Sequence, residues 1–180
     1  FAACVENGTV LACHVGSSSK GASTTADAPA AIPMALSSTM SIYTLGDLLW
    51  ADFWHRFPDL RFSLTEGDIG WIPYFLQRAE HVFDRHNGWI KSERPQGLSP
   101  SELFRERILC YFIEDTIGVR LLDQFNVDNV CWENDYPHSD SSWPDSPEHL
   151  EELFAGLDDA TVNKITHENA MRAYQFDPFA

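Results

Sequence analysis

Residues 127–140 read VDNVCWENDYPHSD, and this stretch decides how the rest of the chain is interpreted. Its apolar part, 129–132, is typical of a short buried strand. The run stops at Glu133, and Asp135, His138 and Asp140 follow within a few positions. In proteins that alternate strands and helices, ligands bind at the carboxyl ends of the strands. The stretch therefore predicts a functional site at the end of this strand.

Three earlier apolar runs, 9–14, 60–65 and 108–113, also read as strands. Helical patterns follow each run: most of 29–57, then 71–83, a short helix from 101, 118–125, 147–157 and 159–174. Residues 87–100 are expected to form a loop, and Asp159 to cap the last helix. Strand and helix thus alternate four times, which predicts a parallel sheet and an α/β fold.

Length and composition describe one globular domain. The chain has 180 residues, 44% of them hydrophobic, which is enough for a buried core. Its formal charge of −15 argues against a nucleic-acid partner and against an anionic membrane surface. No run supplies the ~18 apolar residues that a membrane-spanning helix needs.

Four cysteines, Cys4, Cys13, Cys110 and Cys131, include no CxxC pair, and three of them lie in apolar runs. Free buried thiols fit this pattern better than disulfides, so a reducing, cytoplasmic location is expected. The chain begins Phe-Ala-Ala-Cys in a helix-like pattern, which indicates a fragment of a longer protein.

His14, Glu66 and Asp135 stand at three of the four strand ends, and in a parallel sheet these ends share one edge. Imidazole and carboxylate groups are common ligands for Zn²⁺ or Mn²⁺. A bound metal lowers the pKa of its water or polarises a substrate oxygen, and a neighbouring carboxylate can transfer the proton. The three residues therefore predict a metal-dependent acid–base site.

Each candidate also has a structural alternative. His14 can be a satisfied core histidine, Glu66 can cap the following helix, and Asp135 can brace the turn after it. His138 and Asp140 can fix their loop or touch substrate. The small-residue loop at 15–21, which contains Ser17, can approach a ligand through its backbone or serve as a plain connection.

Four motifs carry a resemblance to a known family: HVGSS (14–18), SLTEGDIGWIPYFLQR (63–78), CWENDYPHSDSSWP (131–144) and KITHENAMRAYQF (164–176). Together they resemble the amidohydrolase-related (amidohydrolase 2) family of metal-dependent hydrolases and nonoxidative decarboxylases. The resemblance implies a (β/α)8 TIM-barrel fold. It also implies that residues 1–180 are the C-terminal part of a single barrel domain, strands five to eight.

The resemblance implies a role for each matching residue. His14 would be the metal ligand from strand five, and Asp135 the strand-eight aspartate that ligates metal and handles a proton. Glu66 stands where decarboxylase relatives carry a proton-transferring histidine. Arg78 matches a helix arginine that holds structure rather than substrate. The implied cofactor is a divalent metal ion, Zn foremost, with Mn or Fe as alternatives.

Half a barrel lacks the family's first strand, which carries two metal ligands in an H-x-H-like motif. A half barrel also leaves two edge strands of its sheet unpaired. We therefore expect this chain to form a homo-oligomer or to pair with the missing N-terminal half. The expected function is that of a hydrolase or decarboxylase acting on a small carboxylated or cyclic substrate. The alternative is a non-catalytic half-barrel that serves as an assembly or binding module.

Overall fold

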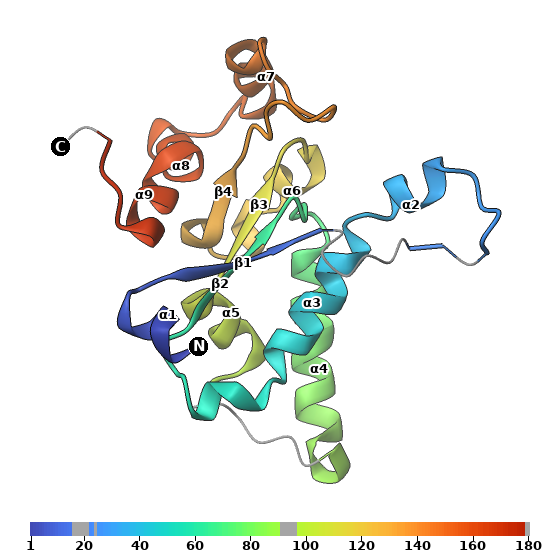
Figure 1. The fold of residues 1–180 in the computed structure, drawn as a ribbon, viewed down its shortest axis with the longest axis vertical. Helices are drawn as coiled ribbons and strands as arrows, with labels where there is room; N and C mark the ends of the chain where they lie inside the picture. The colour runs from blue at the N-terminus through green and yellow to red at the C-terminus, as the bar shows by residue number, and fades with distance from the viewer. Residues whose placement is uncertain (16–21, 24, 91–96, 179–180) are drawn as a thin grey trace.

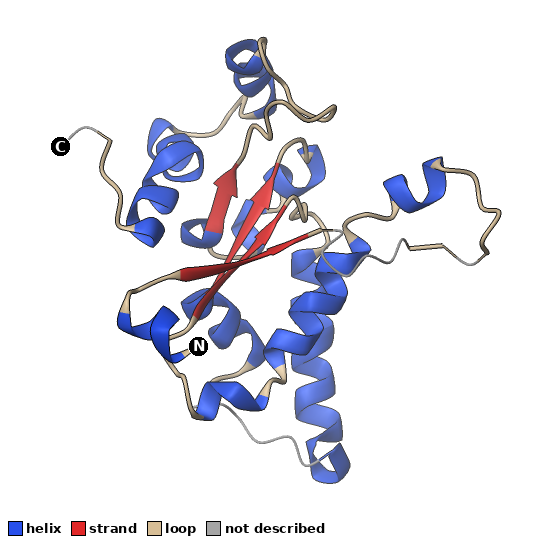
Figure 2. Ribbon diagram, viewed as in Figure 1, coloured by secondary structure: helices blue, strands red, loops and turns tan. Residues whose placement is uncertain are grey.

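The computed structural model of the chain describes residues 1–15, 22–23, 25–90 and 97–178. Its centre is a parallel sheet of four strands: β1 (Val10–His14), β2 (Arg61–Thr65), β3 (Ile108–Phe112) and β4 (Val130–Trp132). The strands lie side by side in the order of the sequence, and helices connect them (Figure 2). This arrangement confirms the predicted parallel α/β fold.

The helices surround the sheet unevenly (Figure 1). They are α1 (Ala2–Glu6), α2 (Ala31–Ala35), α3 (Thr39–Leu49), α4 (Ile72–Ile90), α5 (Pro100–Arg107), α6 (Thr116–Arg120), α7 (Ser146–Leu153), α8 (Asp159–Asn163) and α9 (Asn169–Tyr174), with a π-helical turn at Lys164–Glu168 and 3-10 turns at Asp52–His55, Leu122–Gln124 and Val127–Asn129. Helix α2 projects away from the sheet on the segment between β1 and α3 (Figure 1).

The two faces of the sheet differ because successive side chains of a strand alternate between them. One face packs against the helices and forms the main core, in which Leu64, Cys110 and Phe112 are fully buried. The other face carries a smaller cluster, in which Tyr111 and Cys131 pack against Ala173 of α9. The helices therefore fix the sheet from one side, and α9 reaches the opposite face.

All four strands end at one edge of the sheet. His14, the last residue of β1, pairs with Thr65 of β2, so Glu66 is the next residue along that edge. Glu133, the first residue after β4, donates its N–H to the Phe112 carbonyl at 3.0 Å. The residues that follow β1, β2 and β4 are thus brought together, as parallel pairing requires.

Helix boundaries differ from the sequence-based expectation in several places. The segment 29–57 is broken into α2, α3 and a 3-10 turn. The predicted helix at 118–125 is replaced by the short α6, which begins at Thr116, and the 3-10 turn at Leu122–Gln124. Helix α4 extends to Ile90, into the stretch that was expected to be a loop. Where tertiary packing decides the end of a helix, the hydrophobic periodicity of the sequence does not predict that end.

Caps account for two further corrections. Helix α5 begins earlier than expected, because the Ser99 hydroxyl accepts the Glu102 N–H while the Glu102 carboxylate accepts the Ser99 N–H. This reciprocal capping box sets the start of the helix. The cap of α8 is Asp158 and not Asp159, since the Asp158 carboxylate accepts the Thr161 N–H at 2.9 Å.

All four cysteines are free: Cys110 and Cys131 are buried, and Cys4 and Cys13 are partly buried. In the part of the chain that the structure describes, no helix is long and apolar enough to cross a membrane.

Candidate active site

His14 ends β1 with both ring nitrogens close to oxygen atoms. Its Nδ1 contacts the Val15 carbonyl oxygen, and its Nε2 lies 2.7 Å from the Glu66 Oε1 atom. The Val15 carbonyl is the largest cause of the raised pKa of His14; burial opposes it, and the Glu66 carboxylate adds to it. Since Nδ1–H donates to the carbonyl, Nε2 is the nitrogen that a neutral His14 offers to a ligand.

Glu66 follows β2 in a left-handed conformation, with φ of 55°. This conformation is uncommon for a residue other than glycine, and such residues cluster at functional sites. The Glu66 N–H donates to the Glu133 Oε1 atom at 2.6 Å, so two acidic residues are tied together. Burial, and then a hydrogen bond with Asp135, raise the pKa of Glu66, while His14 lowers it.

Asp135 also has a left-handed backbone, with φ of 57°. Its Oδ2 atom is buried and has no well-formed hydrogen bond within the described residues, although His138 Nδ1 lies 3.0 Å away. A buried carboxylate oxygen without a hydrogen bond needs another partner to offset its desolvation. Either a protonated His138 or a bound cation would supply that partner.

Sequence reasoning assigned no role to Glu133, although it lies at the centre of the acidic group. Burial raises the pKa of its carboxyl to about 7, and the nearby Glu66 and Asp135 carboxylates also raise it, whereas the Glu66 N–H lowers it. The two-residue period of a strand could have indicated this position. Glu133 is two residues from Cys131, so both side chains are expected on the same face of the sheet.

The donor set for a metal is partial. His14 and Asp135 have suitable atoms, but the described ranges contain no group of three or more His, Cys, Asp or Glu side chains placed to hold a metal ion. A catalytic metal site usually has at least three protein ligands. The described residues therefore fit a shared or incomplete metal site, and the remaining ligands would have to come from elsewhere.

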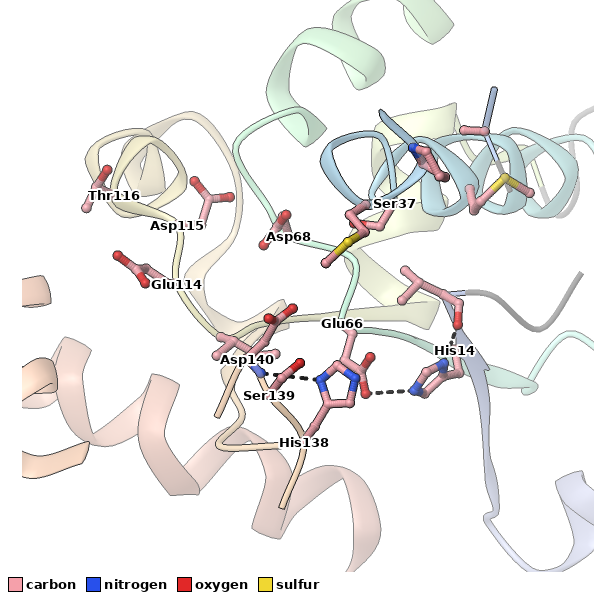
Figure 3. Close-up of a pocket in the computed structure, with 16 residues that line it drawn as sticks. His14, Ser37, Glu66, Asp68, Glu114, Asp115, Thr116, His138, Ser139 and Asp140 are labelled. Carbon is pink, nitrogen blue, oxygen red and sulfur yellow. Dashed lines mark hydrogen bonds and ion pairs between the residues drawn. The ribbon is translucent and has the colours of Figure 1, made fainter. Parts of the chain in front are cut away.

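A cavity of about 960 Å³ opens above this edge of the sheet. His14, Glu66, His138 and Asp140 line it, and Figure 3 shows them beside one another on strand ends and loops. Asp135 is not among its lining residues, but its Oδ2 atom lies 3.0 Å from the Nδ1 atom of His138. The structure thus gathers His14, Glu66 and Asp135 in one place, with His138 and Asp140 at the cavity surface.

Two predicted site residues are not placed there. Ser17 lies outside the described residues. Arg78 is exposed on α4 and does not line the cavity. Its position follows from the course of α4, which runs away from the strand ends (Figure 1).

Asp115 supports the site through the backbone. Its carboxylate accepts the N–H groups of Ile69 and Gly70 at 2.8 and 2.6 Å, and that of Gly118 at 2.7 Å. A carboxylate with three backbone donors locks the loop after β2 to the start of α6. This lock holds the segment that carries Glu66 against the sheet.

A family model described as Amidohydrolase matches residues 1–176. The chain belongs to the amidohydrolase family. A search of curated proteins finds no match to this chain. The family assignment confirms the resemblance that the four sequence motifs carried.

Solved structures match the fold. An amidohydrolase from Mycobacterium avium subsp. paratuberculosis is 18% identical, with a TM-score of 0.72 over 96% of this chain and 44% of its own. The 5-carboxyvanillate decarboxylase from Sphingomonas paucimobilis is 19% identical, with a TM-score of 0.71 over 98% of this chain and 52% of its own.

The 5-carboxyvanillate decarboxylase from Novosphingobium aromaticivorans, solved with manganese and 4-hydroxy-3-methoxy-5-nitrobenzoic acid, is 16% identical, with a TM-score of 0.73. It matches over 98% of this chain and 50% of its own. The chain therefore spans about half the length of these amidohydrolase-superfamily structures, and its sheet corresponds to half of a TIM barrel, as predicted.

Proposed function

We propose that this chain is the C-terminal part of a single barrel domain in a metal-dependent hydrolase or nonoxidative decarboxylase that acts on a small carboxylated or cyclic organic substrate. Its membership of the amidohydrolase family supports a metal-dependent enzyme of this kind. The observation that carries the proposal is the convergence of the His14 imidazole with the Glu66 and Asp135 carboxylates at one edge of the sheet.

His14 Nε2 and the Asp135 carboxylate would hold the metal, with further ligands from outside the described residues. When bound, a divalent ion lowers the pKa of a water molecule or polarises a substrate oxygen. Zn²⁺ suits an imidazole and a carboxylate, as do Mn²⁺ and Fe²⁺. The Novosphingobium decarboxylase was solved with manganese, which supports a divalent metal without selecting zinc.

Asp135 would donate or accept the proton at the substrate, since a carboxylate beside a metal is suited to that task. Glu66 would orient the reacting group beside His14, whose Nε2 atom lies 2.7 Å from the Glu66 Oε1 atom. His138, 3.0 Å from Asp135, would hold that carboxylate in place, and Asp140 would contact substrate at the cavity surface.

The second candidate is a non-catalytic half-barrel that acts as an assembly or binding module. The incomplete donor set among the described residues favours it. Under either function, the open edge of β1 would pair with the N-terminal half of the barrel or with another copy. A cytoplasmic location remains a prediction from the cysteine pattern.

The test uses the complete polypeptide that contains this chain. Elemental analysis of the purified enzyme should find about one divalent metal ion per subunit, and His14→Ala should lower that content. Asp135→Asn should lower turnover on the order of 10²- to 10⁴-fold. The exposed Asp123→Asn is a control with the same loss of charge and should change neither quantity.

A metal content far below one per subunit would favour the non-catalytic module. Full turnover in Asp135→Asn would exclude the proton-transfer role while leaving the metal site intact.

A further inference from the structure

The cavity above the strand ends has walls of two chemical kinds. Four carboxylates line it beyond the His14–Glu66 pair: Asp68, Glu114, Asp115 and Asp140. A second wall comes from the arm, which we define as residues 29–40 with α2, and contributes Pro33, Met34 and Met40. Figure 3 shows Ser37 of the arm and the Glu114–Thr116 loop on either side of Asp68.

Within the described part of the chain, the acidic wall of the cavity is lined by no lysine or arginine. Among the described residues that line the cavity, the basic side chains are His14 and His138. The Asp115 carboxylate is occupied by three backbone N–H groups. Asp68 accepts the Ser38 hydroxyl at 2.5 Å, which leaves room on its carboxylate for a ligand donor.

The carboxylates of this wall repel one another electrostatically. Burial is the largest cause of the raised pKa of Asp68, and the Asp115 and Asp140 carboxylates add to it, while Ser38 lowers it. The negative charges are therefore close enough to interact, and an anionic group placed between them would meet the same repulsion.

The arm exposes apolar surface toward this space. Met34 lines the cavity with 68% of its surface exposed, and Pro33 and Met40 lie beside it. Thioether side chains adapt to irregular shapes and pack favourably against aromatic rings. An exposed apolar wall within a concave site is suited to the hydrocarbon body of a ligand.

We propose that, within the hydrolase or decarboxylase function proposed above on which this inference rests, the cavity selects a ring-bearing substrate whose distal end carries an amine or another hydrogen-bond donor. The ring packs on the arm through Met34 and Met40. The distal donor meets Asp68, which is the specificity-determining residue. A substrate carboxylate would then lie away from Asp68, at the end of the cavity that His14 and Glu66 line.

The test measures binding rather than turnover, and uses the complete polypeptide after the metal has been removed with a chelator. Three probes share one ring and differ in charge: benzylamine, benzyl alcohol and benzoate. Ligand-observed NMR titrations should give benzylamine a dissociation constant at least about tenfold lower than that of benzoate, with benzyl alcohol between them.

Asp68→Asn should reduce this preference, because it removes the negative charge nearest the distal donor while the other carboxylates of the cavity remain. Asn also tolerates the left-handed backbone at this position, where φ is 54°, and can accept the Ser38 hydroxyl. Asp47→Asn, an exposed acid on α3 outside the cavity lining, is the matched control and should keep the preference. Met34→Ala should weaken the binding of all three probes to the same extent. Circular dichroism verifies that each variant is folded.

The proposal is overturned if benzoate binds as tightly as benzylamine, if no probe binds, or if Asp68→Asn keeps the preference. These outcomes leave the metal content and the Asp135→Asn result untouched, so failure of this inference is distinguishable from failure of the proposed function.

Discussion

The Nε2 atom of His14 lies 2.7 Å from the Oε1 atom of Glu66, so the side chains at the end of β1 and just after β2 are in contact at the carboxyl ends of the strands. The two residues are 52 positions apart in the chain. Parallel pairing of β1 with β2 brings them together, because His14 is in register with Thr65. The pair links the expected metal ligand to the acid that would act beside it.

Replacing Glu66 with Gln should lower the pKa of His14. The Glu66 carboxylate raises that pKa through its hydrogen bond and its charge, and Gln removes the charge. NMR titration of the His14 ring in metal-free protein measures the change. Glu148→Gln removes an exposed acid on α7 and should leave the pKa of His14 where it is. An unaltered pKa of His14 in Glu66→Gln would show that the pair makes no electrostatic contribution.

Glu133→Gln should stabilise the metal-free protein at pH 8 and have a smaller effect at pH 5. The pKa of Glu133 is about 7 in the folded protein, above its usual value of 4.5. Between these pH values the folded state therefore keeps Glu133 protonated, whereas the unfolded state has lost that proton. Stability is therefore lost as pH rises from about 4.5 through 7, and Gln abolishes that loss. Partial exposure limits the gain to about 1–2 kcal/mol. Urea unfolding at both pH values tests this, and an equal effect at the two would contradict it.

Two glycine substitutions should have opposite effects on stability. A Cβ on Gly118 would lie 2.2 Å from the Ile69 Cγ1 atom and 2.8 Å from an Asp115 carboxylate oxygen, whereas a Cβ on Gly88 would meet nothing within 4 Å. Gly118→Ala should cost about 1–3 kcal/mol through overpacking. Gly88→Ala, within α4, should add up to about 1 kcal/mol. Denaturant midpoints measure both, and a Gly118→Ala protein as stable as wild type would show that this contact relaxes freely.

Asn169→Ala should destabilise the fold by about 2–3 kcal/mol. Asn169 is fully buried, and its amide donates to the Val127 and Val130 carbonyl oxygens, both at 2.8 Å. Alanine would leave both carbonyls without this donor at the start of β4, the strand that leads to Asp135. Asn163→Ala, exposed on α8, is the matched control. Equal unfolding midpoints for the two variants would argue against a structural role for the Asn169 amide.

The strands were readable from the sequence because they rest on local signals. Continuous apolar runs gave β1, β2, β3 and β4 within a residue or two, and a charged or imidazole group marked the ends at His14 and Glu66. Helix limits were less accurate, since packing and caps such as the Ser99–Glu102 box set them.

The hydrogen bonds within the site could not be predicted from the sequence. The sequence gave no indication that the Glu66 N–H donates to Glu133, or that Asp115 binds the backbone at Ile69, Gly70 and Gly118. Asp115 is 45 or more positions away from Ile69 and Gly70 in the chain. No sequence period or spacing predicts which backbone N–H groups will bind a given carboxylate over such a separation.

By itself the sequence determined the alternation of strands and helices, and with it the edge on which His14, Glu66 and Asp135 would lie, because periodicity and burial are encoded locally. Only the tertiary structure decided what those side chains touch. It buried Glu133 among other acids, left Asp135 Oδ2 without a hydrogen bond among the described residues, and brought the arm into contact with Asp68 through Ser38. The physical reason is that desolvation and electrostatic coupling depend on distances between distant segments, which exist only after the sheet has formed.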